Sequence, residues 1–317
     1  MEIQSSGPNL REYLVDHDPD HVTLIEPGGN HGDRIIYMGM EKLLNDLAIG
    51  FNKVNVYGRF ETSHSNALIQ VVRRAQRWLN TVGSQVSILP FKKIDLAEES
   101  DMVIINGGAN INEFWIHGIY LLKHVVQICN DRSVVVAPQT YFFKNRTVER
   151  ALPRDDDIHL FAREAYSYSL LNRERGLDHL STYLSQDTAL YLTREDLEPS
   201  IDHDLTPSEA YHLASFRQDK EAIISHSVAD RIEEEAANLV SGDISKKAQY
   251  SFEEFVSLVN DADLVYTDRL HVAILGSILE TPVEMYENIY YKNYGVYRQS
   301  LADDDGVTFH RIPDITE

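Results

Sequence analysis

Short, β-branched apolar runs alternate with longer amphipathic segments along most of this chain, and this alternation limits its fold more than any other feature. In the first half, the sequence predicts strands at residues 21–27, 53–58, 84–90, 101–107 and 133–142, and helices at 32–47, 65–83 and 113–130. Strands that are apolar throughout, with helices between them, are typical of a parallel sheet that helices cover on both faces. The first half is therefore predicted to be an α/β domain.

A second alternating set follows residues 193–212, an acidic segment with two prolines that we interpret as a linker. Here the predicted strands are 220–227, 263–268 and 282–287, and the predicted helices are 229–240 and 251–262. We place the domain boundaries at 1–195, 196–212 for the linker, and 213–317. Two α/β domains that face each other would form an interdomain cleft, where such sheets usually bind ligands.

The charge balance restricts the partners. The 317 residues include 50 acidic and 29 basic side chains, which gives a net charge of −21. Such a chain repels nucleic acids and anionic membranes, and it fits a halophilic protein. A single cysteine excludes a disulfide framework, and no long apolar window or signal peptide is present. The sequence predicts a cytoplasmic protein without transmembrane segments.

Two glycine-containing loops follow predicted strands. In the first, Gly28, Gly29, Asn30 and His31 precede Asp33, but the pattern is neither a dinucleotide fingerprint nor a P-loop. Glycines at this place allow a ligand to approach the backbone amides at a helix start. The structural alternative is a tight turn in which Asp33 begins the helix.

The second loop contains Asn106, Gly107, Gly108 and Asn110. Paired glycines followed by asparagines indicate close backbone approach and neutral hydrogen bonding, which suits sugar hydroxyls. A glycine-rich turn with asparagine caps explains the same pattern equally well.

Cationic side chains recur near the ends of predicted strands and the starts of predicted helices. The segment 264–280 has the pattern strand, turn, helix, and it places Arg269 and His271 at a solvated helix start. The others are Arg163, Arg217 and Lys292. An arginine at a helix start is often only a surface group, but repeated cations in an acidic chain indicate a small anionic substrate.

Together these segments resemble the polysaccharide pyruvyl transferase family over residues 27–298. The resemblance rests on GGNHGDRII, DMVIINGGANINEFW, APQ, ARE, DTALYL, FRQDKE, DLVYTDRLHVAI and NIYYKNYGVY, in this order. DRLH and the late Lys-Asn pair are the most specific. Ala109 departs from the family pattern, because it stands where a third glycine is expected.

The resemblance implies two Rossmann-like domains in a glycosyltransferase-B-like arrangement. It also implies phosphoenolpyruvate as the donor and a sugar of a surface or secreted glycan as the acceptor, with a pyruvate ketal as the product. Arg163, Arg269 and His271 fall where the family holds the donor's phosphate and carboxylate, and Lys292 falls at the family's late lysine.

The chemistry of this donor assigns roles to the side chains. His271 titrates near neutrality and is the predicted general acid, or else only a phosphate ligand. The cations, Arg269 first, would stabilise charge on the departing phosphate. Asp33 or Asp219 would accept the proton of the acceptor hydroxyl. We expect no metal or cofactor, with phosphoenolpyruvate as co-substrate.

Two alternatives remain open: a nucleotide-sugar glycosyltransferase of the same architecture, and a non-catalytic glycan-binding subunit. A lipid-linked acceptor would bring the protein to the membrane surface, and a homo-oligomer is left open.

Overall fold

The structure, a computed structural model, describes residues 7–56, 75, 94, 96–115, 117–129, 132–143, 152, 157–173, 180–219, 221–224, 226–236 and 238–311. The chain divides into two compact units. Unit 1 comprises 1–29 and 40–188, and unit 2 comprises 30–39 and 189–317. The first half of one helix thus belongs to unit 2, although it lies far from the rest of that unit in the sequence.

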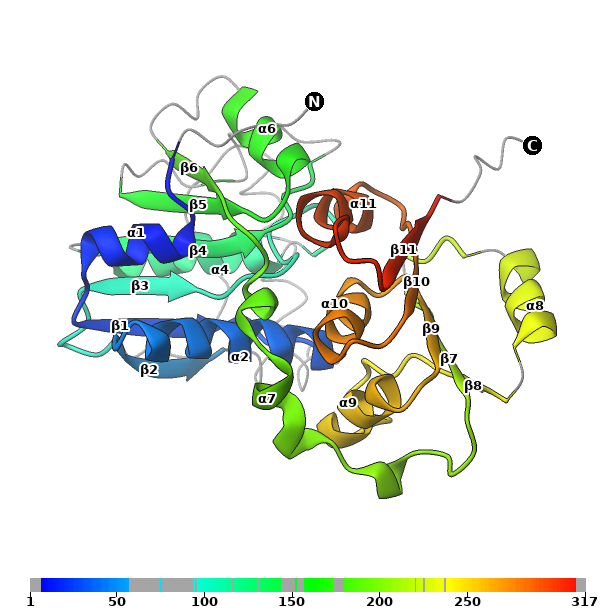
Figure 1. The fold of residues 1–317 in the computed structure, drawn as a ribbon. Coiled ribbons are helices and arrows are strands. Elements are labelled where there is room, and N and C mark those ends of the chain that lie inside the picture. The colour runs from blue at the N-terminus through cyan, green and yellow to red at the C-terminus, as the bar shows by residue number, and fades with distance from the viewer. Residues whose placement is uncertain are drawn as a thin grey trace. The chain divides into compact units, whose positions relative to one another are not determined.

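Unit 1 is built on a six-stranded sheet in the order β2-β1-β3-β4-β5-β6 (Figure 1). Its strands are β1 (His21–Glu26), β2 (Gly50–Asn55), β3 (Met102–Ile105), β4 (Ser133–Gln139), β5 (Ile158–Ala162) and β6 (Ser181–Leu184). Every neighbouring pair is parallel. The strand order reverses between β1 and β3, so this is the switch point where open parallel sheets bind ligands.

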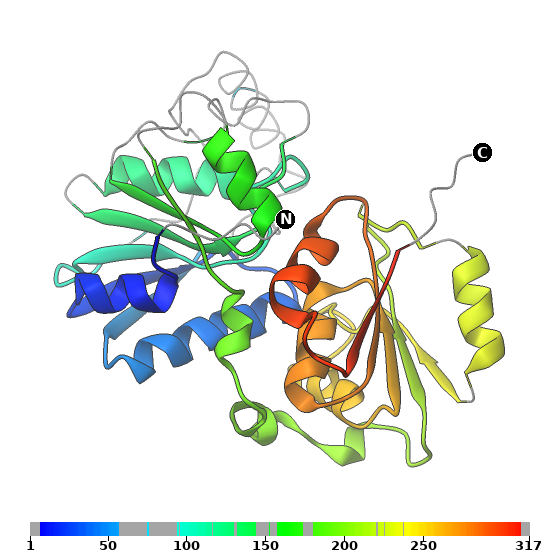
Figure 2. The same ribbon diagram turned by 45° about the horizontal axis from the view of Figure 1, so that its top comes forward.

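Helices cover both faces of this sheet. They are α1 (Leu10–His17), α2 (His31–Asp46), α4 (His117–Ile128) and α6 (Ala165–Arg173). Figure 2 shows α4 on one face and α1 and α2 on the other. On β3, Val103 and Ile105 pack in one cluster with Leu122 and Val125 of α4, whereas the buried Ile104 points to the opposite face.

Unit 2 repeats the same plan with five parallel strands in the order β8-β7-β9-β10-β11. The strands are β7 (His212–Ser215), β8 (Leu239–Ser241), β9 (Leu264–Thr267), β10 (Val283–Tyr286) and β11 (Val307–His310). Counted along the chain, this is the order 2-1-3-4-5 that the first five strands of unit 1 also follow. The switch point of unit 2 therefore lies between β7 and β9.

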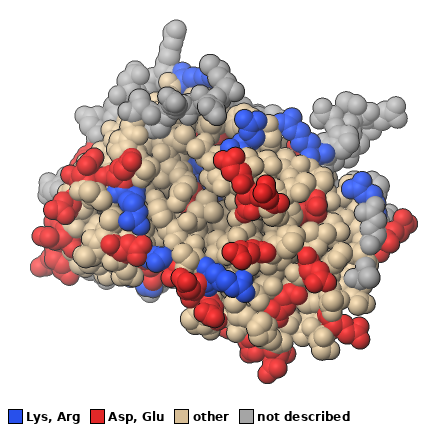
Figure 3. Space-filling view, viewed as in Figure 1, with Lys and Arg blue, Asp and Glu red and all other residues tan. Residues whose placement is uncertain are grey.

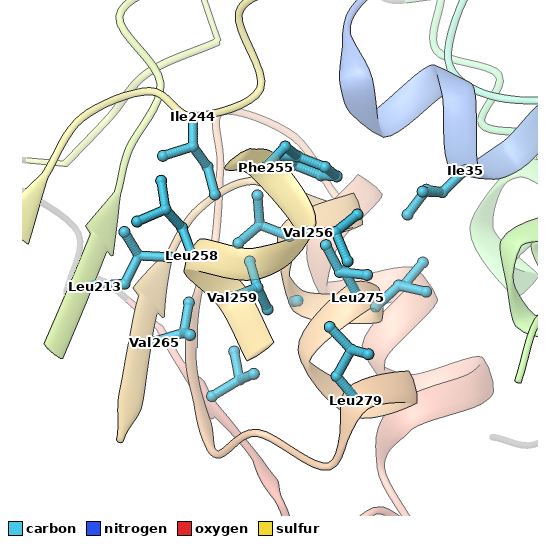
Figure 4. Packing of buried hydrophobic residues seen from close by; sticks show 14 of the residues in the cluster. Ile35, Leu213, Ile244, Phe255, Val256, Leu258, Val259, Val265, Leu275 and Leu279 are labelled. Atoms are coloured by element: carbon cyan, nitrogen blue, oxygen red, sulfur yellow. The ribbon is translucent and has the colours of Figure 1, made fainter. Parts of the chain in front are cut away.

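The helices of unit 2 are α8 (His226–Glu235), α9 (Phe252–Asn260), α10 (Leu270–Leu279) and α11 (Lys292–Val296), which continues as a short π-helix (Tyr297–Leu301). A hydrogen-bonded capping box of Ser251 and Glu254 starts α9, as its sequence indicates. Figure 4 shows the main core, in which Phe255 and Val259 of α9 and Leu275 of α10 lie against the sheet. Ile35 of α2 belongs to the same cluster. Apolar contacts of this kind explain why the first half of α2 belongs to unit 2.

The acidic segment that we interpreted as a linker is ordered and belongs to unit 2. It forms α7 (Arg194–Leu197) and the short 3₁₀ turns Glu198–Ser200 and His203–Leu205. Leu197 is fully buried, and the Asp202 N–H donates to Ser257 Oγ at 2.8 Å. The composition predicts a solvated connection, but one apolar side chain and one backbone bond are enough to hold it on α9.

The fold class, two α/β units each with a parallel sheet, is confirmed. The predicted strand at 220–227 is wrong, because 221–224 are turn or irregular backbone and α8 begins at His226. The first strand of unit 2 is instead β7, which begins inside the predicted linker. Its four residues are too few to form a recognisable strand pattern. The predicted helix at 229–240 ends early, since its last residues form β8. The predicted helix at 65–83 and strand at 84–90 lie outside the described residues, apart from residue 75. The interdomain cleft stays a prediction.

Among the described residues, no helix combines the length and the apolar character that crossing a bilayer requires.

Candidate active site

The switch point of unit 2 brings the ends of β7 and β9 together. Thr267, the last residue of β9, donates its hydroxyl to the Ser215 carbonyl at the end of β7, at 2.6 Å. The Arg217 N–H donates to Asp268 Oδ1 at 2.8 Å. Because all strands are parallel, the loops after β8 and β10 reach the same edge of the sheet. Residues that are distant in the sequence therefore meet here.

Arg269 is the N-cap residue of α10, and it is buried with 8 % exposure. Its Nε donates to Asp243 Oδ1 at 3.0 Å, and its Nη2 pairs with Asp243 Oδ2. Asp243 follows β8 and is itself buried. The expectation of a solvated helix start is wrong, because this two-pronged pair with a buried carboxylate fixes the guanidinium group.

Arg217 and Lys292 belong to the same network. Arg217 donates from Nε and Nη2 to the two oxygens of Asp219, at 3.0 and 2.9 Å, and its Nη1 lies 3.2 Å from Glu221 Oε2. Lys292 Nζ pairs with the same Glu221 oxygen. Arg269 Nη2 lies 3.5 Å from Asp219 Oδ2 and so joins the two halves. Three of the five predicted donor-binding side chains are therefore gathered at one sheet edge.

Electrostatics hold this network in its charged form. Burial raises the pKa of Asp219, but the hydrogen bonds and charge of Arg217 outweigh it and lower this pKa to about 2. The carboxylates that surround Arg217 raise the pKa of its guanidinium against the effect of burial. The ion pair of Arg217 and Asp219 therefore persists over the whole physiological pH range.

His271, in the first turn of α10, packs closely against the first turn of α2. A Cβ atom added to Gly32 would lie 2.8 Å from His271 Cβ and 3.1 Å from its Nδ1. Glycine is required here because any side chain would displace the imidazole. The close approach of the two turns thus depends on Gly32, which the sequence pattern did not single out.

Asp33 and Asn30 cap the start of α2. The Asn30 N–H donates to Asp33 Oδ2 at 2.8 Å, and the Asp33 N–H donates to Asn30 Oδ1 at 3.3 Å. This reciprocal arrangement is a capping box. The structure thus gives Asp33 the helix-start role of the structural alternative, and a catalytic role for it stays a prediction.

His31 connects the first turn of α2 to the rest of unit 2. The backbone N–H of His31 donates to the Ser245 carbonyl at 3.0 Å, and its ring Nε2 donates to the Tyr250 carbonyl at 2.7 Å. The ring stacks on Phe255, with centroids 5.4 Å apart. Burial lowers the pKa of His31, which keeps the imidazole neutral. The preceding Gly28 and Gly29, with φ of 88° and 135°, belong to unit 1, so the predicted loop is shared between the units.

In unit 1, the second predicted loop forms a neutral amide cluster after β3. Gln139, at the end of β4, donates to the Asn106 carbonyl at 3.1 Å and accepts from the Asn110 N–H at 3.1 Å. Gly107 is buried beside them, and Gly108 has a φ of 130°, a value that favours glycine. Gln139 was missed, although its place directly after an apolar run is the same signal that singled out Asn106.

Asn106 is the unusual member of this cluster. It is fully buried, yet neither its Nδ2 nor its Oδ1 has a hydrogen-bond partner among the residues that the structure describes. Nδ2 of Asn110 is also buried without one in that part of the chain. A buried polar group without a partner costs about 1–3 kcal/mol. An amide retained at this cost, beside a switch point, is suited to a ligand that can both donate and accept hydrogen bonds.

Arg163, at the end of β5, lies in unit 1 and not with the other predicted donor-binding residues, which lie in unit 2. It is fully buried, its Nη1 donates to Asp187 Oδ2 at 2.6 Å, and its Nε donates to Thr140 Oγ1 at 2.9 Å. The surface alternative is therefore wrong for Arg163. Asp187 was missed, although it stands in the DTALYL segment of the resemblance.

No group of three or more His, Cys, Asp and Glu side chains within the described ranges could hold a metal ion.

Comparison with known proteins identifies the family. Residues 30–287 match the model of the polysaccharide pyruvyl transferase family. General stress protein 30 of Bacillus subtilis is 21% identical over 243 residues, which cover 70% of this chain and 68% of that protein. "Putative pyruvyl transferase EpsO" of Bacillus subtilis is 21% identical over 216 residues, which cover 61% and 67%.

Among solved structures, a functionally uncharacterized protein of Klebsiella pneumoniae superposes with a TM-score of 0.54 and 22% identity, over 95% of this chain and 96% of that one. This likeness concerns the fold alone. The family match covers most of the chain and includes β9, the Arg269–His271 turn and β10. The chain therefore belongs to the polysaccharide pyruvyl transferase family.

Proposed function

We propose that this protein transfers the pyruvyl group of phosphoenolpyruvate to two hydroxyls of a sugar in a surface or secreted glycan. A proton adds to the methylene carbon of the donor, and C2 becomes an oxocarbenium-like centre. One hydroxyl attacks C2 and loses its proton, the C2–O bond to phosphate then breaks, and the second hydroxyl closes the ketal. One of the two hydroxyl protons balances the proton added to carbon, and the other leaves with the phosphate.

The observation that carries this proposal is the state of Arg269. Nε and Nη2 of its guanidinium are held by Asp243, while Nη1 has no hydrogen-bond partner among the described residues. The ion pair with Asp243 thus fixes the orientation of the Arg269 guanidinium group and leaves its Nη1 edge for an anion. The start of α10 adds a partial positive charge at the same place. This geometry suits a phosphate or a carboxylate, and phosphoenolpyruvate has both.

Lys292 and Arg217 support the same reading, because they bring two further positive charges to this edge of the sheet. Their carboxylate partners fix them in position before the donor arrives. Preorganised charges stabilise a transition state without the cost of reorganising at the moment of reaction. Loss of phosphate from C2 is the step that would use them.

His271 is the proposed general acid, because it lies in the first turn of α10, two residues after Arg269, and its ring position is fixed by close packing against Gly32. For the acceptor, the amide cluster of Asn106, Asn110 and Gln139 in unit 1 is suited to hydroxyls, which donate and accept in the same way. Arg163 is proposed to contact the donor as well, as the resemblance implies.

Phosphate release from phosphoenolpyruvate, measured with a panel of glycan acceptors, tests the proposal. We expect release that depends on the acceptor, and a product whose mass increases by that of one pyruvyl ketal. Thermal unfolding with phosphoenolpyruvate or with nucleotide sugars, each alone, distinguishes the donors. Stabilisation by a nucleotide sugar and not by phosphoenolpyruvate would instead support a glycosyltransferase, and no stabilisation by either would support a glycan-binding subunit.

A further inference from the structure

Asp268 lies at the centre of the charged network of unit 2, but no role has been assigned to its side chain. It follows β9 directly and is fully buried. Its backbone carbonyl accepts from Asn293 Nδ2 at 2.7 Å, and the same amide also donates to the Tyr286 carbonyl at 2.8 Å. The residue is therefore fixed on both sides, to β10 through Asn293 and to the β7 loop through Arg217.

The two oxygens of the carboxyl group have unequal surroundings. Oδ1 accepts the Arg217 N–H at 2.8 Å, whereas Oδ2 is buried without a hydrogen-bond partner in the part of the chain that the structure describes. A carboxylate in a protein interior normally accepts hydrogen bonds at both oxygens, because an unsatisfied buried charge is costly. A carboxylic acid needs only one acceptor contact and can use its other oxygen to donate.

Each of the three neighbouring cations has a carboxylate partner other than Asp268. Arg217, Arg269 and Lys292 face it from the β7 loop, from its own turn and from α11. These three cations pair with three other carboxylates, those of Asp219, Asp243 and Glu221. Lys246 adds a fourth cation, because its Nζ lies 3.7 Å from Asp243 Oδ2. With an ionised Asp268 the network is therefore neutral, and a neutral Asp268 leaves it one net positive charge, which favours the binding of an anion.

We propose that Asp268 binds the anionic donor as a neutral carboxylic acid, with Oδ2–H donating a hydrogen bond to an oxygen of the donor's phosphate or carboxylate. This inference rests on the proposed function, because it requires an anionic donor at this edge of the sheet. The bond exists only when a proton is present on Asp268. Donor binding is consequently coupled to the uptake of one proton.

The acidity of the group agrees with this role. Burial raises the pKa of Asp268 to about 6, although the Arg217 N–H and the charges of Arg217, Arg269 and Lys292 lower it. A bound anion raises this pKa further. In the free protein at pH 7.5 the group is therefore largely ionised, and it takes up its proton as the donor arrives.

The test is the pH dependence of phosphoenolpyruvate binding in the wild type and in Asp268→Asn. Asparagine keeps an oxygen for the Arg217 N–H and offers a permanent N–H donor in place of Oδ2–H. Between pH 6.5 and 8.5, wild-type affinity should fall more steeply than that of the variant, by up to about tenfold per pH unit. The phosphate of the donor also titrates in this range, but its effect is common to both proteins and cancels in the comparison.

Asp219→Asn is the matched control, because Asp219 lies in the same network but stays ionised over this range. It should keep the steep wild-type profile, whatever its absolute affinity. Calorimetry in buffers with different ionisation enthalpies gives a second readout. At pH 7.5, the wild type and Asp219→Asn should take up about one proton more than Asp268→Asn on binding.

This inference would be overturned if phosphoenolpyruvate affinity fell equally with pH in the wild type and in Asp268→Asn, and if both proteins took up the same number of protons on binding. The proposed function would remain intact. Failure of the wild type to bind phosphoenolpyruvate at any pH would instead overturn the proposed function and this inference with it. If Asp268→Asn does not fold, the ¹³C shift of the Asp268 carboxyl in the wild type decides. In the complex with phosphoenolpyruvate, a ¹³C shift typical of a protonated carboxylic acid supports the inference, and a shift typical of an ionised carboxylate overturns it.

Discussion

At the switch point of unit 1, the loops after β1 and β3 carry glycines and amides, whereas at the switch point of unit 2 the loops after β7 and β9 carry guanidinium groups and carboxylates. The strand order around both points is the same. In unit 1, the side-chain amide of Asn106 is buried with no hydrogen-bond partner among the described residues, and in unit 2 every cation of the network has a carboxylate partner. One backbone plan thus supports a neutral site and a charged site, and the side chains at the strand ends decide which it becomes.

The two sites also differ in how they prepare for a ligand. Within the part of the chain that the structure describes, the side-chain amide of Asn106 makes none of its hydrogen bonds, so unit 1 loses some stability that a bound ligand would restore. Arg269 already has a strong partner and keeps one edge for a ligand, so unit 2 holds its charges in place beforehand. The following experiments test this contrast.

The largest effect is expected for Arg269→Ala in unit 2. Loss of a preorganised charge at the departing phosphate should lower turnover by about a hundredfold to a thousandfold. The variant should also lose stability, by up to about 3–5 kcal/mol, because the buried Asp243 loses its two-pronged partner and keeps only the Ser245 hydroxyl and Lys246, whose Nζ lies 3.7 Å away. Arg269→Lys keeps the charge but loses the planar fork, so an intermediate turnover is expected.

Arg194→Ala is the control for that experiment. Arg194 also lies in unit 2 and donates from its guanidinium to the Leu279 carbonyl and to Asn260, but it takes no part in the network. Its loss should leave turnover unchanged. Wild-type turnover in Arg269→Ala would remove this residue from the reaction and with it the charged half of the contrast.

The second-largest effect is expected for His271→Gln. Glutamine keeps a neutral hydrogen-bond donor but cannot protonate carbon, so turnover should fall by about a hundredfold while donor affinity changes little. His203→Gln is the control, because His203 is an exposed histidine of the same unit that pairs with Asp261. Unchanged turnover at saturation with a collapse of donor affinity would make His271 a phosphate ligand.

In unit 1, Asn106→Leu should have opposite effects on function and on stability. Removing both unpartnered polar atoms should raise the free energy of unfolding by about 1 kcal/mol, yet the KM for the acceptor should rise by about tenfold, the scale of one lost hydrogen bond. Donor affinity should not change. Denaturant unfolding and steady-state kinetics measure the three quantities.

Gln139→Leu is the matched comparison, since its amide makes both of its hydrogen bonds, to Asn106 and Asn110. This change should lower the free energy of unfolding by about 1–3 kcal/mol, because it leaves two backbone groups without partners. Equal losses of stability in the two leucine variants would contradict the view that the amide of Asn106, unlike that of Gln139, is left for a ligand.

A smaller effect concerns the pH dependence of stability in the free protein. The pKa of Asp268 in the folded state, about 6, lies above the ordinary value for aspartate, so the unfolded state releases this proton first. The free energy of unfolding is therefore unaffected by this group below about pH 4, where Asp268 is protonated in both states. It decreases as pH rises from about 4 to about 6, and above that it stays lowered. Asp268→Asn should be the more stable protein at pH 7, by at most about 3 kcal/mol, and the advantage should vanish at pH 4.

Thermal unfolding of both proteins from pH 4 to pH 8 measures this difference. A constant difference at all pH values would mean that Asp268 does not titrate with a raised pKa in the folded protein.

The smallest effect is expected from salt. Acidic side chains outnumber basic ones on the face of the molecule in Figure 3, in line with the net charge of −21. Self-repulsion should be screened by counter-ions, so the melting temperature should rise with potassium chloride concentration. A flat response below molar salt would remove the halophilic interpretation.

The elements that the sequence predicts well are the long or strongly apolar ones. β1, β3, β4 and β9 lie within predicted strands, and α9 follows its capping box. β7 was missed because its four residues, HLAS, gain their stability from pairing with β8 and β9 and not from their own composition. A short strand in the middle of a sheet is specified by its neighbours.

For the candidate site, the sequence by itself determined the cations and the amides, because Arg, Lys and Asn stand directly after apolar runs. Only the tertiary structure decided their partners. Asp243 is 26 residues from Arg269, and Glu221 is 71 residues from Lys292, and no local pattern links either pair. The cause is the parallel sheet, which brings the carboxyl end of every strand to one edge whatever the sequence separation. Contacts between distant residues also decided that Arg163 is buried with Asp187 and that the first half of α2 belongs to unit 2. The capping of α2 by Asp33 and Asn30 is local, and the sequence already offered it.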